Sequence, residues 1–254
     1  MEFKSVNKTL ENSFKNNWER EALSNYQGST LKYKEVAERI EYLHIAFSQC
    51  GLKRGDKVAL CSRNQANWAV CFLATMTYGA VPVPILHEFK AENIHYLVNH
   101  SEAKVLFVDE VIWDGLSESE MPDLEVIVQI NNLKFIYARN RFDEEIRGSL
   151  QKTFDKLYPE GFKPENLKYY EDKADELALI NYTSGTSGFS KGVMIPYRAL
   201  WCNINFARTV AEPQMTCESE IVAMLPSAHM YGMMFEFLFE MTIGAHVHFL
   251  TRTP

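Results

Sequence analysis

The segment from Lys57 to Ile85 constrains the fold of this chain more than any other. Lys57–Cys61 is a short apolar run typical of a buried strand, Gln65–Tyr78 has the length of a helix, and Ala80–Ile85 is a second apolar run. The order strand, helix, strand predicts a βαβ unit with two parallel strands. A helix at 90–100 and a strand at 104–108 extend this unit, so we expect a parallel sheet buried on both faces.

The same order of elements recurs between residues 221 and 249. An apolar run at 221–225 is followed by an apolar stretch and by a second run that starts at Gly244. Gly79 lies 21 positions after Val58, and Gly244 lies 22 positions after Val222. This similarity indicates a duplicated architecture, with two independent βαβ units as the alternative.

The expected fold class is therefore α/β, with two similar βαβ-containing subdomains whose largely parallel sheets are flanked by helices. The first subdomain and a connector are expected at 1–170, and a hairpin followed by the start of the second subdomain at 171–254. The second copy is expected to be incomplete, because its next helix and strand would lie past Pro254. An amphipathic helix is predicted at 31–49, a strand at 124–130, a charged helix at 143–157 and a surface connector at 158–174.

Charge and cysteine usage exclude some classes of function. A formal net charge of −7 disfavours nucleic-acid binding, which depends on clustered Lys and Arg to neutralise phosphates. The five cysteines are odd in number and form no C-x-x-C pair, and the N-terminus lacks the apolar core of a signal peptide. Residues 64–86 are uncharged, but polar residues and prolines interrupt them, so no transmembrane segment is expected. We expect a cytoplasmic protein, with its oligomeric state and any peripheral membrane contact left open.

The loop after Leu177 carries the chemistry. Residues 177–194 read L-A-L-I-N-Y-T-S-G-T-S-G-F-S-K-G-V-M, a strand that runs into glycines and hydroxyls and is closed by Lys191. Glycines let a backbone turn sharply and present its N–H groups to an anion, hydroxyls donate to phosphate oxygens or organise a metal ion, and lysine adds positive charge. The spacing does not fit a Walker A loop, which disfavours a P-loop NTPase. The alternative is an ordinary polar hairpin between strands at 177–182 and 192–196.

The run from Tyr182 to Val193, Y-T-S-G-T-S-G-F-S-K-G-V, resembles the signature of the adenylate-forming superfamily, usually Y-T-S-G-T-T-G-x-P-K-G-V. The resemblance continues in residues 55–59, 64–68, 79–84 and 225–232, and it is strongest to long-chain fatty acid–CoA ligases. Two positions depart from the pattern, Ser187 for the second threonine and Ser190 for the proline. Ser187 keeps the hydroxyl, whereas Ser190 lacks the ring that fixes φ, so the loop is expected to be more mobile than is typical.

The resemblance implies ATP-dependent activation of a carboxylic acid to acyl-AMP, followed by transfer of the acyl group to the thiol of coenzyme A. It implies ATP, Mg²⁺, CoA and a small carboxylic acid as ligands, and it implies that Thr183 and Lys191 take part in catalysis and that Thr183 helps hold the metal. The residues that the resemblance assigns to ATP are Thr183, Ser184, Gly185, Thr186, Ser187, Gly188 and Lys191.

By the same resemblance, His229 borders the acyl pocket together with Met230, Tyr231 and Gly232. Met233, Met234 and Phe235 could line the same apolar channel or belong to the core. A core histidine bonded to the backbone is the alternative for His229. His246 and His248 project from one side of a strand at a spacing that can suit a metal, but no further ligand is evident, so they are expected to be ordinary strand residues.

The family places its adenine-binding segment, an acidic metal ligand, a ribose-binding aspartate and a C-terminal domain with a catalytic lysine after the region matched here. We therefore expect this 254-residue chain to make no acyl-adenylate by itself. Two alternatives stay open, an adenylation enzyme for amino or aryl acids and a noncatalytic nucleotide-binding module.

Overall fold

Five strands form the first sheet, in the order β4-β3-β5-β6-β7. The computed structural model describes residues 2–138, 144–183, 190–211 and 214–250. The strands of this sheet are β3 (Lys57–Cys61), β4 (Val81–Ile85), β5 (Ala103–Val108), β6 (Val126–Gln129) and β7 (Lys134–Ala138). The first four are parallel, and β7 pairs antiparallel with β6 at the edge. The predicted parallel sheet is confirmed, and β7 is an addition that the sequence does not predict.

The second sheet has the order β10-β11-β1-β2. Its strands are β1 (Glu21–Asn25), β2 (Thr30–Lys32), β10 (Glu220–Ala223) and β11 (His246–Phe249). β10, β11 and β1 are parallel, and β2 pairs antiparallel with β1. The predicted pair of parallel strands near the C-terminus is present, but half of its sheet comes from the N-terminal 32 residues. Strand pairing therefore crosses the division expected at residue 170.

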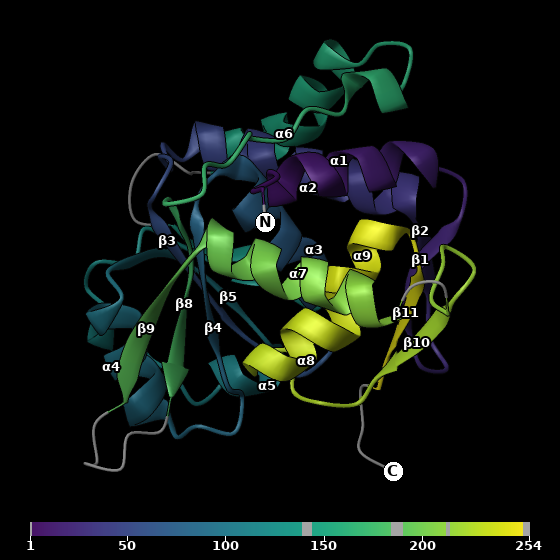
Figure 1. The fold of residues 1–254 in the computed structure, drawn as a ribbon. Helices are drawn as coiled ribbons and strands as arrows, with labels where there is room; N and C mark the ends of the chain where they lie inside the picture. Colours follow the sequence, from purple (N-terminus) through teal and green to yellow (C-terminus); the bar gives the residue numbers. More distant parts are fainter. Residues whose placement is uncertain (1, 139–143, 184–189, 212–213, 251–254) are drawn as a thin grey trace.

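The helices lie between and around the sheets (Figure 1). They are α1 (Val6–Asn16), α2 (Tyr33–Gln49), α3 (Ala66–Tyr78), α4 (Ala91–His100), α5 (Glu110–Trp113), α6 (Glu144–Leu157), α7 (Tyr197–Ala211), α8 (Met230–Met233) and α9 (Phe239–Ile243). Short 3₁₀ turns occur at η1 (Glu118–Glu120) and η2 (Pro164–Asn166), and the π-helical turn η3 (Met234–Leu238) joins α8 to α9. No helix in the described ranges combines the length and apolarity needed to cross a bilayer.

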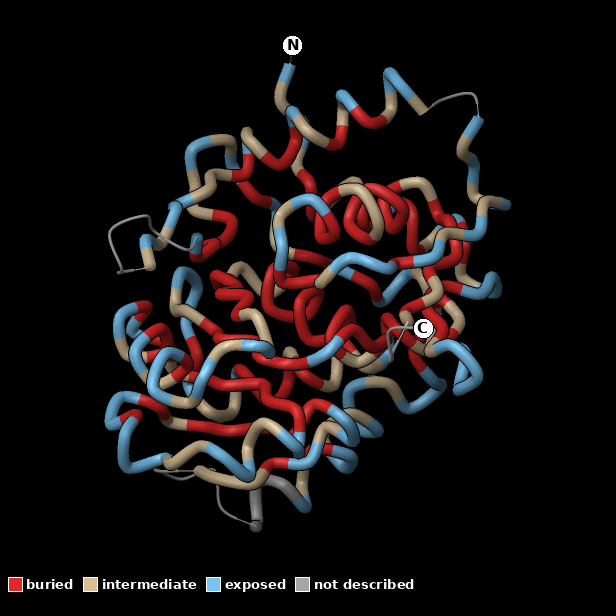
Figure 2. Tube along the Cα trace, turned by 90° about the horizontal axis from the view of Figure 1, so that it is seen from below, coloured by how far each residue is buried: buried red, intermediate tan, exposed pale blue. Residues whose placement is uncertain are grey.

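Helix α3 lies at the centre of the fold. It contacts β1 of the second sheet and β3 and β4 of the first, and between Ala66 and Thr77 every side chain except Asn67 is buried. A helix that is apolar all round must be covered on all sides, which explains this position between two sheets. The main core is continuous across both sheets, because one cluster joins Val58 and Val105 to Leu23 and Val247. Figure 2 shows the buried positions gathered in these inner layers.

The two halves end their helices in the same way. Gly79 follows α3 with φ +88°, and Gly244 follows α9 with φ +84°, both in the left-handed region. Each glycine is followed by a strand parallel to the strand that precedes the helix. Glycine is required here because a side chain at either position would meet a neighbour, the Tyr170 ring at 2.9 Å or Asn17 Nδ2 at 2.1 Å. Both predicted βαβ units are therefore present, each with a glycine between its helix and its second strand.

The segment 158–174 is mostly exposed or half-buried, as a surface connector should be, but four of its residues are buried. Phe162, Leu167, Tyr169 and Asp172 are buried. The Asp172 carboxylate accepts hydrogen bonds from Ser5 Oγ at 2.6 Å and from the backbone N–H of Asn7 at 2.8 Å, at the start of α1. This connector therefore also anchors the start of α1 through a few inward side chains, which its composition does not reveal.

Candidate functional site

A two-stranded antiparallel hairpin positions the phosphate-binding loop predicted from the sequence. β8 (Leu177–Thr183) and β9 (Lys191–Pro196) pair so that Thr183 lies opposite Lys191 at the open end. Both residues are exposed. Ser184, Gly185, Thr186, Ser187 and Gly188, which the resemblance assigns to ATP, lie outside the described residues. The hairpin alternative describes the strands correctly and is compatible with a ligand-binding loop between them.

The hairpin is fixed to the first sheet. β8 packs against β4, and the hydroxyl of Tyr182 lies 2.7 Å from Nδ1 of His100 on α4. Burial raises the pKa of Tyr182 to about 12, so this phenol is neutral at physiological pH. A Cβ on Gly192 would lie 3.2 Å from the Tyr182 ring, so the two strands meet closely just before the loop. A rigid support of this kind lets a short loop hold its ligand groups in place.

Two asparagines attach the second predicted segment to this region. Asn64 Nδ2 donates to the Leu225 carbonyl at 2.7 Å, and Asn64 Oδ1 accepts from the Ser227 backbone N–H at 2.7 Å. Asn181 on β8 donates to the carbonyl of Ala228 at 3.0 Å. The segment 225–229 is therefore held between the loop after β3 and the last residues of β8. This brings His229 to the hairpin end that carries Thr183.

His229 is an exposed residue at the start of α8. Its backbone precedes the helix, and its Nδ1 accepts a hydrogen bond from the Tyr231 N–H at 3.3 Å. It is therefore not a buried core histidine, although it does have a backbone partner. Gly232 allows α8 to pack on the preceding turn, because a Cβ there would be 2.9 Å from the Pro226 carbonyl oxygen.

An apolar groove of about 300 Å³ lies between α7 and the α8–η3–α9 segment. Tyr231 and Phe235 line it from the segment predicted as substrate pocket, but Met233 and Met234 are buried in the core and Met230 packs against it. The remaining lining residues are Phe206, Ala207, Val210, Ala211, Met215, Phe239 and Glu240. The contribution of α7 is not evident in the sequence, because nothing local marks that helix as facing the 230–240 segment.

Glu240 is a buried ionisable residue beside this groove. It is 1% exposed, and its Oε2 atom has no hydrogen-bond partner among the described residues. Burial raises the pKa of Glu240 to about 8. The carboxyl is therefore mainly protonated at neutral pH, as expected for an acid in apolar surroundings.

The described part of the site suits a polyphosphate with a metal ion. The Lys191 side chain is exposed and has no ion-pair partner among the described residues, so its ammonium is available to an anion. The exposed Thr183 hydroxyl stands across the hairpin and can coordinate or donate. Asn64 and Asn181 were not predicted as part of the site. Asn64 nevertheless lies in a segment, 64–68, that carries the family resemblance.

Comparison with known sequences gives the family. A profile described as AMP-binding enzyme matches residues 10–254. Long-chain-fatty-acid–CoA ligase 1 of Homo sapiens is 26% identical over 210 residues, which cover 79% of this chain and 30% of the ligase. Long chain acyl-CoA synthetase 1 of Arabidopsis thaliana is 28% identical over 242 residues, covering 92% of this chain and 36% of that protein. The chain thus spans about a third of the length of these curated relatives.

Comparison of structures gives the fold. The crystal structure of ATP-bound MatB from Rhodopseudomonas palustris superposes with a TM-score of 0.73 at 21% identity, over 96% of this chain and 46% of that one. The expected architecture of an adenylate-forming enzyme's N-terminal domain is thereby confirmed. Because the family profile covers nearly all of the chain, this protein belongs to the AMP-binding enzyme family.

Proposed function

We propose that this chain is part of an ATP-dependent acid–thiol ligase that converts a long-chain fatty acid to acyl-AMP and then to acyl-CoA. The observation that carries the proposal is the hairpin, which sets Thr183 opposite Lys191 beside the turn that ends at His229. Family membership supports ATP use and ligase chemistry. Curated relatives named as long-chain fatty acid ligases support the choice of acid.

The roles of the hairpin residues follow from where charge develops. When a carboxylate attacks the α-phosphate, negative charge accumulates on the departing pyrophosphate, and positioned cations and N–H donors stabilise it. We assign this stabilisation to Lys191 and to the loop residues Ser184, Gly185, Thr186, Ser187 and Gly188. Thr183 would hold Mg²⁺ or a phosphate oxygen through its hydroxyl. Its fixed position at the end of β8 reduces the cost of ordering that contact.

The acyl chain is assigned to the groove between α7 and α8. Tyr231 and Phe235 face Phe206 and Val210 across it, and these side chains offer an apolar surface of the kind that a hydrocarbon chain buries. His229 lies two residues before Tyr231 and is held near the hairpin, so it would border the carboxylate end of the acid. Met230 and Gly232 support this turn from the side of the core.

Binding of inorganic pyrophosphate with Mg²⁺ tests the assigned anion site directly. In calorimetry on this 254-residue chain, Lys191→Ala should weaken pyrophosphate binding by more than about 1 kcal/mol, the loss expected for one charge-assisted hydrogen bond. Lys152→Ala on α6 is the matched control, an exposed lysine remote in the sequence from the hairpin. Equal affinities for the three proteins, or no pyrophosphate binding by the unmodified chain, would contradict the assignment.

The choice of acid is tested by pyrophosphate release with a panel of carboxylic acids. In a longer protein of the length of the curated relatives, long-chain fatty acids should give the highest kcat/KM. A preference for aryl or amino acids would replace that substrate class while leaving the hairpin assignment intact. This chain alone should form no acyl-AMP with any of them, and acyl-AMP detected by mass spectrometry would overturn that expectation.

A further inference from the structure

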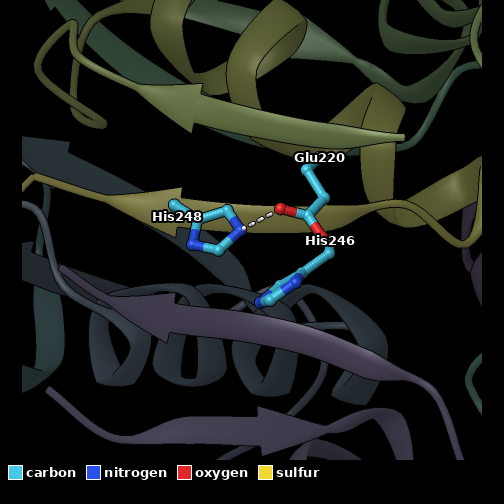
Figure 3. A group of neighbouring side chains, drawn as sticks. All are labelled: Glu220, His246 and His248. Carbon is cyan, nitrogen blue, oxygen red and sulfur yellow. Dashed lines mark ion pairs between the residues drawn. The ribbon is translucent and has the colours of Figure 1, made fainter. Parts of the chain in front are cut away.

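The outer face of the second sheet carries a cluster of metal-binding side chains that is separate from the hairpin. His246 and His248 project from β11, and Glu220 lies beside them on β10 (Figure 3). The strands pair in parallel with Glu220 opposite His246, which fixes this neighbourhood. One nitrogen of each imidazole and one carboxylate oxygen all lie within 4.8 Å of one another. The sequence shows the two histidines, but the third ligand becomes evident only through the strand register.

The geometry of the two rings favours a shared cation. Their centroids are 4.0 Å apart with an interplanar angle of 41°. Nε2 of His248 is buried and has no hydrogen-bond partner among the described residues, although Glu220 Oε2 lies 3.3 Å away. A buried ring nitrogen directed at a carboxylate, without a hydrogen bond of good geometry, is an unmet polar group that a metal ion would satisfy.

The neighbouring strand β1 supplies the supporting contacts. Ser24 Oγ lies 2.7 Å from Nε2 of His246 and 2.6 Å from Thr30 Oγ1. When Ser24 donates to Thr30, it can accept Nε2–H from His246, which leaves Nδ1 with a free lone pair. Ligating histidines usually give their other N–H to such a partner. The carboxylate of Glu21 lies 3.6 Å from that Nδ1 and adds negative charge.

We propose that Glu220, His246 and His248 form a binding site for Zn²⁺, with water as the fourth ligand. Two imidazoles and one carboxylate are a common set of three protein ligands for Zn²⁺. Imidazole nitrogen suits Zn²⁺ and similar transition metals, whereas Mg²⁺ prefers oxygen ligands. The ion would join the edge strand β10 to β11, and it would stabilise the folded chain in proportion to its occupancy.

The test uses the chelator-treated 254-residue chain. Zinc titration should give one ion per chain by calorimetry and elemental analysis, a higher Tm, and with Co²⁺ the visible absorption of a four-coordinate site. Glu220→Gln and His248→Gln should each weaken Zn²⁺ binding at least tenfold and remove most of the Tm increase. His87→Gln, in the turn after β4 of the first sheet, should bind as the unmodified chain does.

Glu220 is exposed, so its replacement should leave the fold intact even if His248→Gln proves unstable. Unchanged zinc affinity in Glu220→Gln or His248→Gln would overturn the proposal. Zinc bound by the cysteine thiols instead of these side chains would overturn it too. A chain that binds no zinc at low micromolar concentration would overturn it as well.

Discussion

At the scale of single residues, Asn64 holds the turn at 225–227 beside the candidate site, a role that the local sequence around it does not reveal. Its amide bonds both the Leu225 carbonyl and the Ser227 N–H, so one side chain fixes the turn that leads to His229. Asn64→Ala should lower the free energy of unfolding by about 1–3 kcal/mol, because two backbone groups lose their partner. Urea unfolding measures this.

Asn99→Ala is the control for that substitution, since Asn99 makes one bond, to the Glu120 carbonyl, in an exposed setting. Its effect should stay within about 0.5 kcal/mol. Equal losses in the two variants would show that the clamp at 225–227 contributes nothing beyond an ordinary surface hydrogen bond.

Glu240 should make stability depend on pH. Its pKa is about 8 in the folded chain and near 4.5 when the chain is unfolded, so between these values the folded state holds a proton that the unfolded state has lost. Stability from this group is present below pH 4.5 and declines as the pH rises toward 8, by roughly 1.4 kcal/mol per pH unit for one proton. Glu240→Gln should abolish that decline.

The measurement for Glu240 is urea unfolding of both proteins at several pH values from 5 to 9. The difference between the glutamine variant and the unmodified chain should grow with pH and level off above 8. Two parallel curves would mean that the Glu240 carboxyl is ionised in the folded protein and has a partner there.

The residues of the site were predictable to different degrees. Thr183, Lys191 and His229 stand in a local motif, and the structure places them at the hairpin end and the turn beside it. Asn64 and Asn181 act through backbone carbonyl and amide groups more than 40 residues away, and no local pattern records such bonds. Glu220 was not predicted as a neighbour of His246 because that contact depends on the pairing of β10 with β11.

At the scale of elements, a glycine with positive φ follows both α2 and α9, but the two glycines differ in their surroundings. Gly51 and Gly244 both have positive φ, +77° and +84°, but only at Gly244 would a Cβ meet a neighbour, the Asn17 amide at 2.1 Å. Asn17 cannot easily move, since its Nδ2 donates to the Ser13 carbonyl at 2.8 Å. Gly244 therefore has a packing role as well as a conformational one.

Gly51→Ala should cost roughly 1–2 kcal/mol in unfolding free energy for the left-handed backbone alone. Gly244→Ala should cost at least about 1 kcal/mol more, because it also displaces Asn17. Thermal and urea unfolding of both variants compare the two costs. In a double-mutant cycle, adding Asn17→Ala should recover part of the Gly244→Ala loss, and strict additivity would contradict the proposed clash.

The elements themselves were predictable where hydrophobic periodicity is strong and local. The expected strand at 57–61 coincides with β3, and the expected helix at 65–78 differs from α3 by one residue. The short strands β1 and β2 were missed, because E-A-L-S-N and T-L-K are too short and polar to stand out. β7 was missed for a related reason, since it forms only as an edge addition to β6.

At the scale of the whole molecule, the shared core should make the chain unfold as one unit. Trp68 on the central helix stacks on Phe72 at 5.2 Å and meets the edge of Phe237 from η3, so its environment reports on both halves. Because one apolar cluster spans both sheets, melting curves from tryptophan fluorescence and far-UV circular dichroism should coincide. Two separated transitions would mean that the sheets are independent folding units.

The position of β1 has a consequence for synthesis in the cell. Leu23 of β1 pairs with Val247 of β11. β1 is therefore synthesised long before the strand with which it pairs. At about 5–20 residues per second, ribosomes need roughly 10–45 seconds to cover that interval. Until β11 is made, the edge of β1 that pairs with it lacks this partner, and we expect the exposed edge to make the nascent chain prone to aggregation.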